Sequence, residues 1–600
     1  MAKDKETLLI YDLETNAIDP NVAVPQLMGC KSSISDEFVW TSNIDEMVAL
    51  INGADIIVGY NNKEYDDVIM TRYGANFRGK VNIDLMQIIH GKGFGNDLGR
   101  KGIITTRDGT HLGTILHGKS LADTTRALGG PLKIGDFDYD LFKHKFGTLT
   151  EEQQKLALEY LEADIEATQY IYEYLEEYFA NFKDGGITID GEFRPFMRDD
   201  QIQKKQYLTA STAAWTYKAI CNLAGLEEKY NNAEHEGYGG GFVALPTQEY
   251  AKGDIYCLDY NSLYPHIMIQ ANLYGPQREI DNGFHLRGMS ETTGTYNCKT
   301  LAPVGRVLKE LYAKRLEYKK EKDAKEYTIK IIINTIYGLL GNPAFASVYN
   351  HTAAADCTRL GRSWVNAARL HFKEHGYTVL YTDTDSVYLL DPFHDKDRLL
   401  AVKDKHINDI KRTVPFPQDT FDMGIDDEIR YMAFFKGSGG NFLKKNYLYV
   451  TKDGKLKLKG LPIVKSTSTK LGRVIFDKHI APLIINENVH KVQRKDLDKW
   501  VEEELAADLS VASVFYKVRD LAEYNSMTSI QAQVAKAKGP GQYNLLKLKR
   551  EHQKGIGGGR NYLDVNDAEG LRISALDLSK TWAELGHFIA TEQKTLEAFW

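Results

Sequence analysis

Two aspartates separated by a single residue, Asp383 and Asp385, lie in the run Tyr381-Thr-Asp-Thr-Asp-Ser-Val-Tyr388. The β-branched and aromatic residues around them favour a strand that leads into a tight turn. Side chains at positions i and i+2 share one face of a strand, so the two carboxylates should converge. A solvated turn would also accommodate Asp and Thr. The apolar residues on both sides instead indicate a buried hairpin, in which paired carboxylates need a cation, usually a divalent one.

A second set of acids begins at Asp12 and Glu14, again at i and i+2, in the hydrophobic run Leu8–Thr15. Asp66 follows another apolar stretch, residues 54–59. Tyr160 and Asp164 stand at i and i+4 in a segment of helical periodicity, and therefore share one helix face. Any one of these acids alone would be read as a surface charge. Together they could hold two magnesium ions and orient a water for phosphodiester hydrolysis.

A further acid, Asp259, ends the strand-like run Tyr256-Cys-Leu-Asp259. The residues Asn261-Ser262 that follow can cap a helix, and Pro265 is tolerated in its first turn. A helix N-terminus beside a metal-binding acid is well placed to hold a triphosphate. Tyr264 would stand close to the sugar of such a ligand, or else serve as a core aromatic.

Residues 304–340 predict two helices around the charged turn 319–325. Arg315 and Lys319 fall on one face of the first helix, and Lys330, Asn334 and Tyr337 fall on one face of the second. A charge run of this kind is usually a solvated face. The ordered spacing instead favours a pair of helices that present their cations to one polyanion.

The composition of the 600-residue chain is that of an ordinary globular protein with several domains: 43% hydrophobic, 26% charged and a net charge of −7. The five cysteines form no Cys-x-x-Cys pair, which argues against zinc and iron–sulfur sites and fits a reducing cytosol. No apolar run reaches transmembrane length, and the first residues lack a signal-peptide core. Beyond Lys459 the pattern predicts helices, with a basic, glycine-rich segment at 536–560 that would contact duplex backbone or form a surface loop.

Taken in order, these motifs resemble those of the B family of DNA polymerases. Asp259–Pro265 resembles the family's motif A, Lys330–Gly338 motif B and Tyr381–Ser386 motif C. Other runs are similar to further family motifs: Thr358-x-x-Gly361-Arg362, Lys445-x-Tyr447, Tyr238-Gly-Gly-Gly241, and three proofreading motifs, Asp12-x-Glu14, Asn62-x-x-Tyr-Asp66 and Tyr160-x-x-x-Asp164.

The resemblance implies a role for each polymerase-site residue. Asp259 and Asp385 would bind two catalytic Mg²⁺ (or Mn²⁺) ions, with Asp383 nearby and less directly engaged. Three cations would hold the incoming dNTP, Asn334 and Tyr337 would line the nascent base pair, and Tyr264 would be the steric gate against ribose; the three cations are Arg315, Lys319 and Lys330.

The resemblance also implies a proofreading exonuclease site and a set of DNA contacts. Four acids, Asp12, Glu14, Asp66 and Asp164, would bind two metal ions, Tyr160 would orient the attacking water, and Lys133 resembles a lysine that assists this site in small phage members. The expected DNA contacts are Asn62, Tyr238, Gly239, Gly240, Thr358, Arg362, Lys445 and Tyr447.

The implied fold is a multidomain α/β protein, in which an RNase H-like exonuclease domain precedes a right-hand polymerase. The expected boundaries are 1–185 for the exonuclease, 186–300 for the first part of the palm, 301–352 for the fingers, 353–458 for the second part of the palm and 459–600 for the thumb. The first proofreading motif begins as early as Asp12, and this short N-terminal region resembles that of the small phage and plasmid enzymes. The chain would be a monomer in the cytoplasm, of a bacterial host if phage-encoded, with no membrane contact.

The expected partners are primer-template DNA and dNTPs, with a single-strand-binding protein, a helicase or a processivity factor as accessory partners. The short intervals between motifs A, B and C leave little room for the insertions of protein-primed members, so a nucleic-acid primer is expected. Three alternatives stay open: a protein-primed polymerase with reduced insertions, a non-catalytic nucleic-acid-binding relic and a nuclease alone.

Overall fold

The computed structural model describes residues 6–35, 37–90, 119–131, 137–234, 237–273, 296, 299–437, 439–465, 468–486, 492–518, 521, 529–539, 541–554 and 560–589. The chain divides into two compact units. Unit 1 comprises Met1–Tyr238, Tyr264–Ile280 and Thr293–Cys357, and unit 2 comprises Gly239–Leu263, Asp281–Thr292 and Thr358–Trp600. The five domain boundaries expected from the sequence remain predictions.

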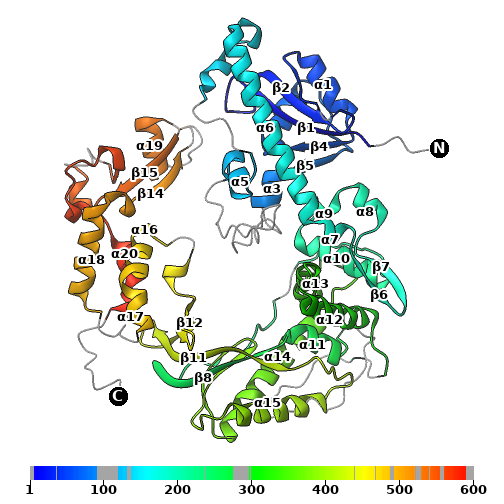
Figure 1. Cartoon of the computed structure of the whole chain (residues 1–600), viewed down its shortest axis with the longest axis vertical. Coiled ribbons are helices and arrows are strands. Elements are labelled where there is room, and N and C mark those ends of the chain that lie inside the picture. Colours follow the sequence, from blue (N-terminus) through cyan, green and yellow to red (C-terminus); the bar gives the residue numbers. More distant parts are fainter. Residues whose placement is uncertain are drawn as a thin grey trace. The chain divides into compact units, whose positions relative to one another are not determined.

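Unit 1 begins with a five-stranded sheet of order β3-β2-β1-β4-β5 (Figure 1). Its strands are β1 (Leu8–Thr15), β2 (Pro25–Ser32), β3 (Val39–Thr41), β4 (Ile56–Gly59) and β5 (Val81–Asp84). The strand β1 is antiparallel to β2 and parallel to β4, which is parallel to β5. This mixed order, with β1 at its centre, is the RNase H-like arrangement.

Helices flank this sheet: α1 (Ile44–Gly53), α2 (Asp66–Arg72), α3 (Leu85–His90), α5 (Leu121–Ala127) and the long α6 (Glu151–Tyr178). A capping box fixes the start of α6, because the Thr150 hydroxyl accepts from the Gln153 backbone and the Gln153 side chain accepts from the Thr150 backbone. The buried face of α6 carries Tyr160, Leu161 and Asp164 and packs against β1 and β2. The fold therefore delivers Tyr160 and Asp164 to the sheet that carries Asp12 and Glu14.

The rest of unit 1 is mostly helical. It contains α7 (Ala180–Lys183), the hairpin of β6 (Gly186–Ile189) and β7 (Glu192–Pro195), α8 (Asp199–Gln203), α9 (Gln206–Thr209), α10 (Thr212–Ala224), α11 (Leu263–Gln270), α12 (Pro303–Glu321) and α13 (Lys325–Leu340). The two helices predicted between residues 304 and 340 are confirmed, and α12 continues into the predicted turn as far as Glu321. Both α12 and α13 pack on α10.

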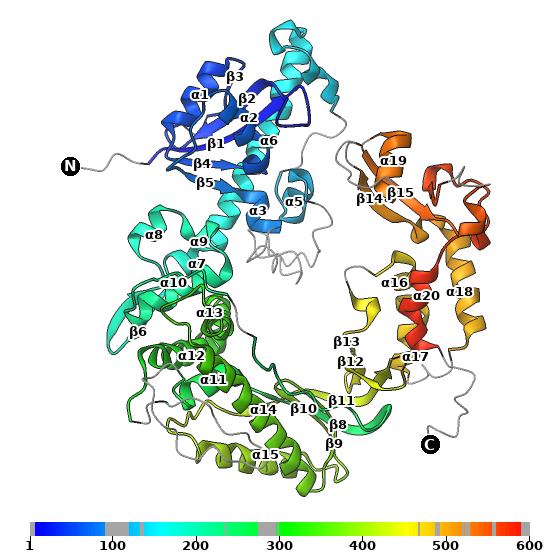
Figure 2. The same ribbon diagram turned by 180° about the vertical axis from the view of Figure 1, so that it is seen from behind.

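Unit 2 is built on a six-stranded antiparallel sheet of order β13-β12-β11-β8-β10-β9, seen from behind in Figure 2. The strands are β8 (Tyr250–Tyr260), β9 (Thr378–Asp383), β10 (Ser386–Leu390), β11 (Met423–Lys436), β12 (Phe442–Thr451) and β13 (Leu456–Lys459). The helix α15 (Lys396–Lys411) lies between β10 and β11 in the chain, and α14 (His351–Glu374) contributes its C-terminal part to this unit. The register sets Ser386 of β10 opposite both Asp259 and Asp383.

The C-terminal part of unit 2 combines helices with a small antiparallel sheet, β14-β15-β16. Its elements are α16 (Lys470–Ile475), α17 (Ala481–Ile485), α18 (Arg494–Ala507), β14 (Val514–Val518), α19 (Ile530–Lys538), β15 (Gly541–Lys547), β16 (Tyr562–Asp564) and α20 (Ser579–Leu585). The sequence predicted helices here, and the small sheet corrects that expectation. The strand β15 runs through the basic, glycine-rich segment.

Candidate active sites

The Asp383–Asp385 stretch forms a hairpin, as predicted, but the two carboxylates do not share one strand face. Strand β9 ends at Asp383, β10 begins at Ser386, and these two residues pair. Thr384 lies in the left-handed region with a φ of 61°, as two-residue hairpin turns require positive φ. Asp385 therefore lies in the turn itself, and the chain reverses between the two acids.

Asp385 is grouped with Asp259, the acid at the end of β8. The Ser386 hydroxyl donates to Asp259 Oδ2 at 2.6 Å, and the Tyr260 amide donates to the Asp385 carbonyl at 3.1 Å. Burial, followed by the charge of Asp385, raises the pKa of Asp259 to about 7. Burial, followed by the charge of Asp383, also raises the pKa of Asp385. Burial thus disfavours the ionised form of both carboxylates, and the charge of Asp385 adds to this effect at Asp259.

Asp383 has a cation of its own. Lys445 Nζ lies 3.0 Å from Asp383 Oδ1 and donates to the Thr384 hydroxyl at 3.1 Å, while the Tyr447 hydroxyl donates to Asp383 Oδ2 at 3.3 Å. These contacts join the predicted residues Lys445 and Tyr447 to the motif C hairpin. Lys445 contacts Asp383 directly and also favours the charged form of Asp385. That Asp383 is less directly engaged with metal ions remains a prediction.

Sequence reasoning missed two charged residues beside the pair. Asp426 of β11 contributes a further negative charge that raises the pKa of Asp259, after burial and Asp385. Lys459, the last residue of β13, favours the charged forms of both Asp259 and Asp385, although burial outweighs it. The adjacency of β11 to β8 and of β13 to β12 creates this neighbourhood, and no spacing in the sequence signals it.

The Asp259–Asp385 pair fits a divalent cation. Hard cations such as Mg²⁺ prefer carboxylate oxygens, and a bound cation would stabilise the ionised forms that burial and the neighbouring acids disfavour. The donor set is therefore suited to the Mg²⁺ (or Mn²⁺) ions that the sequence led us to expect.

In the metal-free protein, we expect stability to decrease as the pH rises from about 4 to about 7. An unfolded aspartate titrates near pH ~4, whereas the pKa of Asp259 in the folded protein is about 7. Between these values the folded state holds the extra proton, so this group lowers the free energy of unfolding by at most about 1.4 kcal/mol per pH unit. Urea unfolding with EDTA should show a steeper decrease in the wild type than in Asp259→Asn, because Asp385 and Asp66 contribute to the slope of both proteins. Equal slopes would contradict the raised pKa of Asp259.

The four predicted exonuclease acids come together in unit 1. Carboxylate oxygens of Asp12, Glu14 and Asp164 all lie within 4.8 Å of one another. Asp12 and Glu14 project from the same face of β1, and Asp164 reaches them from α6. Asp66 is buried at the start of α2, and its pKa is raised well above the usual range by burial, followed by the charge of Asp12. Such a cluster of acids fits divalent metal ions.

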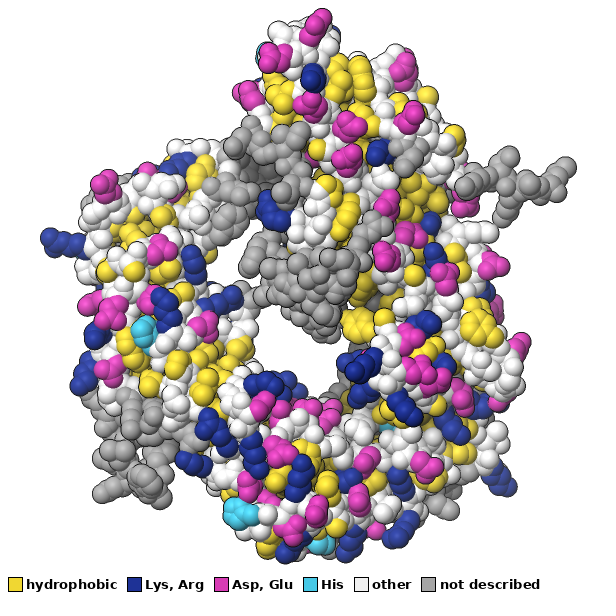
Figure 3. Space-filling model, in the orientation of Figure 1, with side chains coloured by type: hydrophobic (Ala, Val, Ile, Leu, Met, Phe, Trp, Pro, Cys, Tyr) yellow, Lys and Arg dark blue, Asp and Glu magenta, His cyan; other side chains and the backbone are white. Residues whose placement is uncertain are grey.

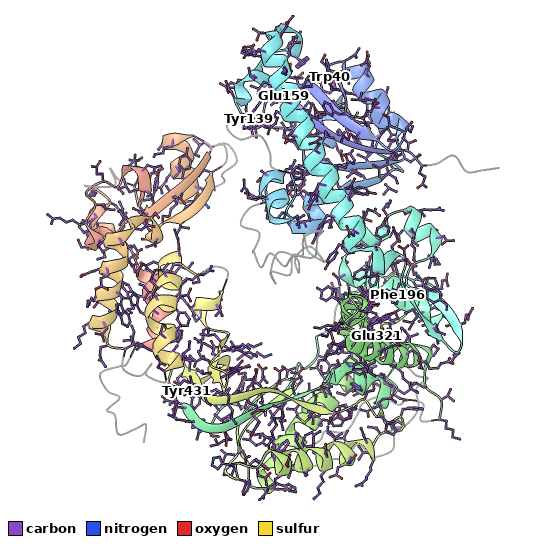
Figure 4. All side chains as sticks on the ribbon, in the orientation of Figure 1. Trp40, Tyr139, Glu159, Phe196, Glu321 and Tyr431 are labelled. Carbon is purple, nitrogen blue, oxygen red and sulfur yellow. The ribbon has the colours of Figure 1, made fainter. Side chains whose placement is uncertain are left out.

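Tyr160 lies beside this cluster in an aromatic setting. Its pKa is raised far above the usual range by burial, followed by the negative charge of Asp164, so it stays a neutral hydroxyl. The hydroxyls of Tyr160 and Tyr139 lie 2.9 Å apart, and the Tyr160 ring stacks on Phe137 with centroids 4.1 Å apart. Tyr139 is 61% exposed, and Figure 4 shows it beside α6. Sequence reasoning missed Tyr139, and Lys133 lies outside the described residues.

Asn62 is a buried residue of the exonuclease region. Its Nδ2 donates to Asp67 Oδ1 at 3.2 Å and to Asn82 Oδ1 at 2.9 Å, and the side chain is 0% exposed. Asp67, which sequence reasoning missed, is also held by Asn82 Nδ2 at 2.6 Å and by the Tyr11 hydroxyl. Asn62 therefore orders a polar network behind Asp66, and its expected contact with DNA remains a prediction.

The residues expected around the nucleotide belong to unit 1. Lys319, Lys330 and Asn334 are exposed on α12 and α13, while Arg315 Nε forms an ion pair with Glu326 Oε1 at 2.8 Å that ties the two helices together. The sequence did not indicate this ion pair. It means that Arg315 is held in place by α13, with part of its guanidinium already engaged.

Three tyrosines from distant motifs meet in the same unit. The rings of Tyr264 and Tyr337 have centroids 4.6 Å apart, and the Tyr337 hydroxyl donates to the Tyr238 hydroxyl at 3.1 Å. Gly341, just after α13, allows this approach, since a Cβ there would come within 2.2 Å of the Tyr238 hydroxyl oxygen. These three tyrosines thus form one packed group. Tyr264 is the expected sugar gate, Tyr337 the expected base-pair contact and Tyr238 the first residue of the glycine motif.

The remaining predicted DNA contacts lie in unit 2. Arg362 Nη1 donates to the carbonyls of Gly239 at 2.8 Å and Gly240 at 2.7 Å, which fixes the glycine run against α14. Thr358, one turn earlier on the same helix, is 3% exposed and therefore packs in the interior. The structure therefore joins two motifs that the sequence analysis treated separately.

The chain is a multidomain α/β protein, in which an RNase H-like sheet with an acid cluster is followed by an antiparallel sheet with a carboxylate pair at a hairpin. The description "DNA polymerase family B" is that of the family model that matches residues 194–557. This match covers more than half of the chain, and the chain belongs to DNA polymerase family B.

Relatives and solved structures agree with this assignment. A DNA polymerase of Archaeoglobus fulgidus is 24% identical over 528 residues, which cover 81% of this chain and 60% of the relative. DNA polymerase 1 of Saccharolobus solfataricus is 29% identical over 289 residues, 44% of this chain and 30% of the relative. The family B DNA polymerase of Pyrobaculum calidifontis shares the fold, with a TM-score of 0.51 and 17% identity over 99% of this chain and 79% of that one. The expected α/β multidomain fold is confirmed, while this chain matches only part of the length of its curated relatives.

Proposed function

We propose that this chain is a template-directed DNA polymerase that extends a nucleic-acid primer with dNTPs and proofreads with a 3′→5′ exonuclease. Family membership supports the polymerase class. The observation that carries the proposal is the Asp259–Asp385 pair, two partly buried carboxylates with raised pKa values that fit a divalent cation. Primer extension that depends on divalent metal and on this pair tests it.

In the proposed synthesis reaction, Asp259 and Asp385 would hold the two metal ions. When bound, these ions would supply the positive charge that activates the primer 3′-hydroxyl and stabilises the leaving pyrophosphate. Lys445 keeps Asp383 compensated. Arg315, Lys319 and Lys330 would bind the triphosphate, and the ion pair with Glu326 already orients Arg315.

In the proposed proofreading reaction, Asp12, Glu14, Asp66 and Asp164 would hold metal ions around the phosphodiester to be cleaved. Tyr160 is neutral and stacked, so its hydroxyl can orient a water without losing its proton. Tyr139 supports the Tyr160 hydroxyl from the exposed side. The acid cluster and this tyrosine pair support the exonuclease proposal.

Replacing Tyr264 by alanine should relax discrimination between dNTPs and rNTPs. The Tyr264 ring stands against Tyr337, and its removal would open the space that a ribose 2′-hydroxyl needs. Steric rejection of one small group is worth roughly 1–3 kcal/mol, so selectivity should decrease by roughly 10- to 200-fold. The ratio of kcat/KM for dCTP and CTP in single-nucleotide extension measures it. Tyr264→Phe is the matched control, and unchanged selectivity in Tyr264→Ala would remove the gate assignment.

We also propose that the chain is a small phage- or plasmid-type enzyme that acts as a cytoplasmic monomer. It would start from a nucleic-acid primer and work with the accessory proteins named above. Transfer of a deoxynucleotide to a protein hydroxyl without primer would instead favour protein priming. Among the described residues, no helix is long and apolar enough to cross a membrane.

The charge distribution is consistent with local rather than global attraction of DNA. The face over α15 and the large sheet in Figure 3 shows Lys and Arg interspersed with Asp and Glu, and the net charge is −7. Binding to a polyanion must therefore rely on particular groups of cations.

A further inference from the structure

One face of helix α14 carries a row of cations in unit 2. Arg362, Arg369 and Lys373 stand at i, i+7 and i+11, with Asn366 at i+4, so all four project from the same side of the helix. Arg362 is the motif residue that binds the Gly239 and Gly240 carbonyls. Arg369 and Lys373 belong to none of the motifs that the sequence analysis singled out.

The described carboxylates do not neutralise the other two cations of the row, Arg369 and Lys373. Arg369 Nε donates to Asn366 Oδ1 at 3.0 Å, which orients the guanidinium through a neutral partner. Among the residues that the structure describes, neither Arg369 nor Lys373 forms an ion pair. By contrast, Lys403 and Lys457 of the same unit are both paired with carboxylates. Two neighbouring cations that have no carboxylate partner in the described part of the chain repel each other, so binding of an anion beside them is favourable.

A cavity of about 200 Å³ adjoins this pair. Arg369 and Lys373 line it together with residues 244, 245 and 247 and the first part of β9, and the described lining includes no carboxylate. The strand β9 is an edge of the sheet. The chain that leaves the glycine run passes along this edge, since the Thr384 amide donates to the Phe242 carbonyl at 2.9 Å and the Ala244 amide to the Thr382 hydroxyl at 2.8 Å.

The lining suits a sugar-phosphate more than a bare ion. Leu245 is 46% exposed at the cavity, and Ala244, Val379 and Leu380 add further apolar surface. An arginine guanidinium can hold a phosphate through two parallel hydrogen bonds, and the lysine adds a point charge. A cavity of this size can take a phosphate and its sugar, but not a stack of base pairs.

We propose that Arg369 and Lys373 form a binding site for the phosphodiester backbone of DNA, which extends the contact of Arg362 along α14. The inference rests on the proposed function, since a polymerase must hold a strand beyond its catalytic acids. From Arg362 to Lys373 the helix rises roughly 16 Å, at about 1.5 Å per residue. That span equals the axial rise of roughly five nucleotides of one strand, so the row can follow a single backbone.

The salt dependence of DNA binding tests this site. The double variant Arg369→Gln/Lys373→Gln removes both charges and retains polar side chains of similar reach. The slope of log K against log salt should become less steep by roughly 1.4–1.8, the value for two lost phosphate contacts. Fluorescently labelled DNA, titrated with EDTA present to prevent catalysis, gives the slope. Lys405→Gln on α15, combined with Arg412→Gln just after it, removes the same charge elsewhere in unit 2 and should leave the slope near the wild-type value.

Three DNA probes identify which backbone is bound: a blunt duplex, a primer-template with a long template overhang, and a single strand. A change of slope confined to the overhang and single strand would assign the site to unpaired template, and a change with the blunt duplex would assign it to duplex. A double variant with the wild-type slope on all three probes would overturn the proposal, as would an equal change in the α15 control. If the double variant unfolds, Lys373→Gln alone, at an exposed position, should reduce the slope by roughly 0.7–0.9.

Primer extension by the wild type on the same primer-template separates this inference from the proposed function. Extension by the wild type together with an unchanged slope in the variant would overturn the phosphate site alone. A changed slope without any wild-type extension would overturn the polymerase proposal and leave the phosphate site standing.

Discussion

Asp385→Ala is expected to abolish primer extension and to leave degradation of single-stranded DNA intact. Asp385 is the acid of the hairpin that is paired with Asp259, while Asp383 is compensated by Lys445. If these two carboxylates hold the catalytic ions as proposed, removal of one should cost several kcal/mol of transition-state stabilisation, a decrease in rate of roughly 10³-fold or more. Single-turnover extension of a labelled primer with Mg²⁺ measures it.

A matched control is Asp397→Ala, which removes an exposed acid of α15 in the same unit. This variant should extend primers at the wild-type rate, and both variants should digest single strands equally. Extension by Asp385→Ala at a rate close to the wild type would remove Asp385 from the catalytic pair. Loss of both activities would point instead to misfolding, which the melting temperature would reveal.

The double variant Asp12→Ala/Glu14→Ala is expected to lose removal of a mismatched primer terminus and to retain synthesis. Asp12 and Glu14 supply two of the three carboxylates that lie within 4.8 Å of one another. Without them, Asp164 has no partner acids on β1, and metal-dependent hydrolysis should decrease by roughly 10³-fold or more. Release of the terminal nucleotide from a mismatched, labelled primer gives the rate.

Glu159→Ala provides the control for this experiment, because Glu159 is an exposed acid on the same helix as Asp164 (Figure 4). It should proofread normally. A double variant that still removed mismatched termini as fast as the wild type would show that the acid cluster is not the nuclease site, without affecting the polymerase assignment.

The strands and helices that carry the acids could be predicted from the sequence wherever a single strand or helix contains the whole motif. Asp12 and Glu14 share a face because β1 runs uninterrupted to Thr15. Tyr160 and Asp164 share a face because α6 is one continuous helix. The same i, i+2 argument was wrong for Asp383 and Asp385, since Asp385 lies in the two-residue turn that begins with Thr384 at positive φ.

Residues that depend on contacts between distant segments could not be predicted. The spacing of α12 gives no sign that Arg315 would pair with Glu326 across the turn. Lys459 and Asp426 approach Asp259 and Asp385 only through the strand order of the large sheet. In the C-terminal part, alternation of short strands and helices follows from tertiary packing, and local periodicity there favoured helices alone.

The most direct test of the central claim is extension on a long, singly primed circular DNA. With dNTPs and Mg²⁺, the wild type should convert the annealed DNA primer into long products, whereas Asp385→Ala should yield none and the unprimed circle should remain unchanged. Absence of products from the wild type under these conditions, or equal synthesis by Asp385→Ala, would contradict the assignment of Asp259 and Asp385 as the catalytic pair of a DNA-primed polymerase.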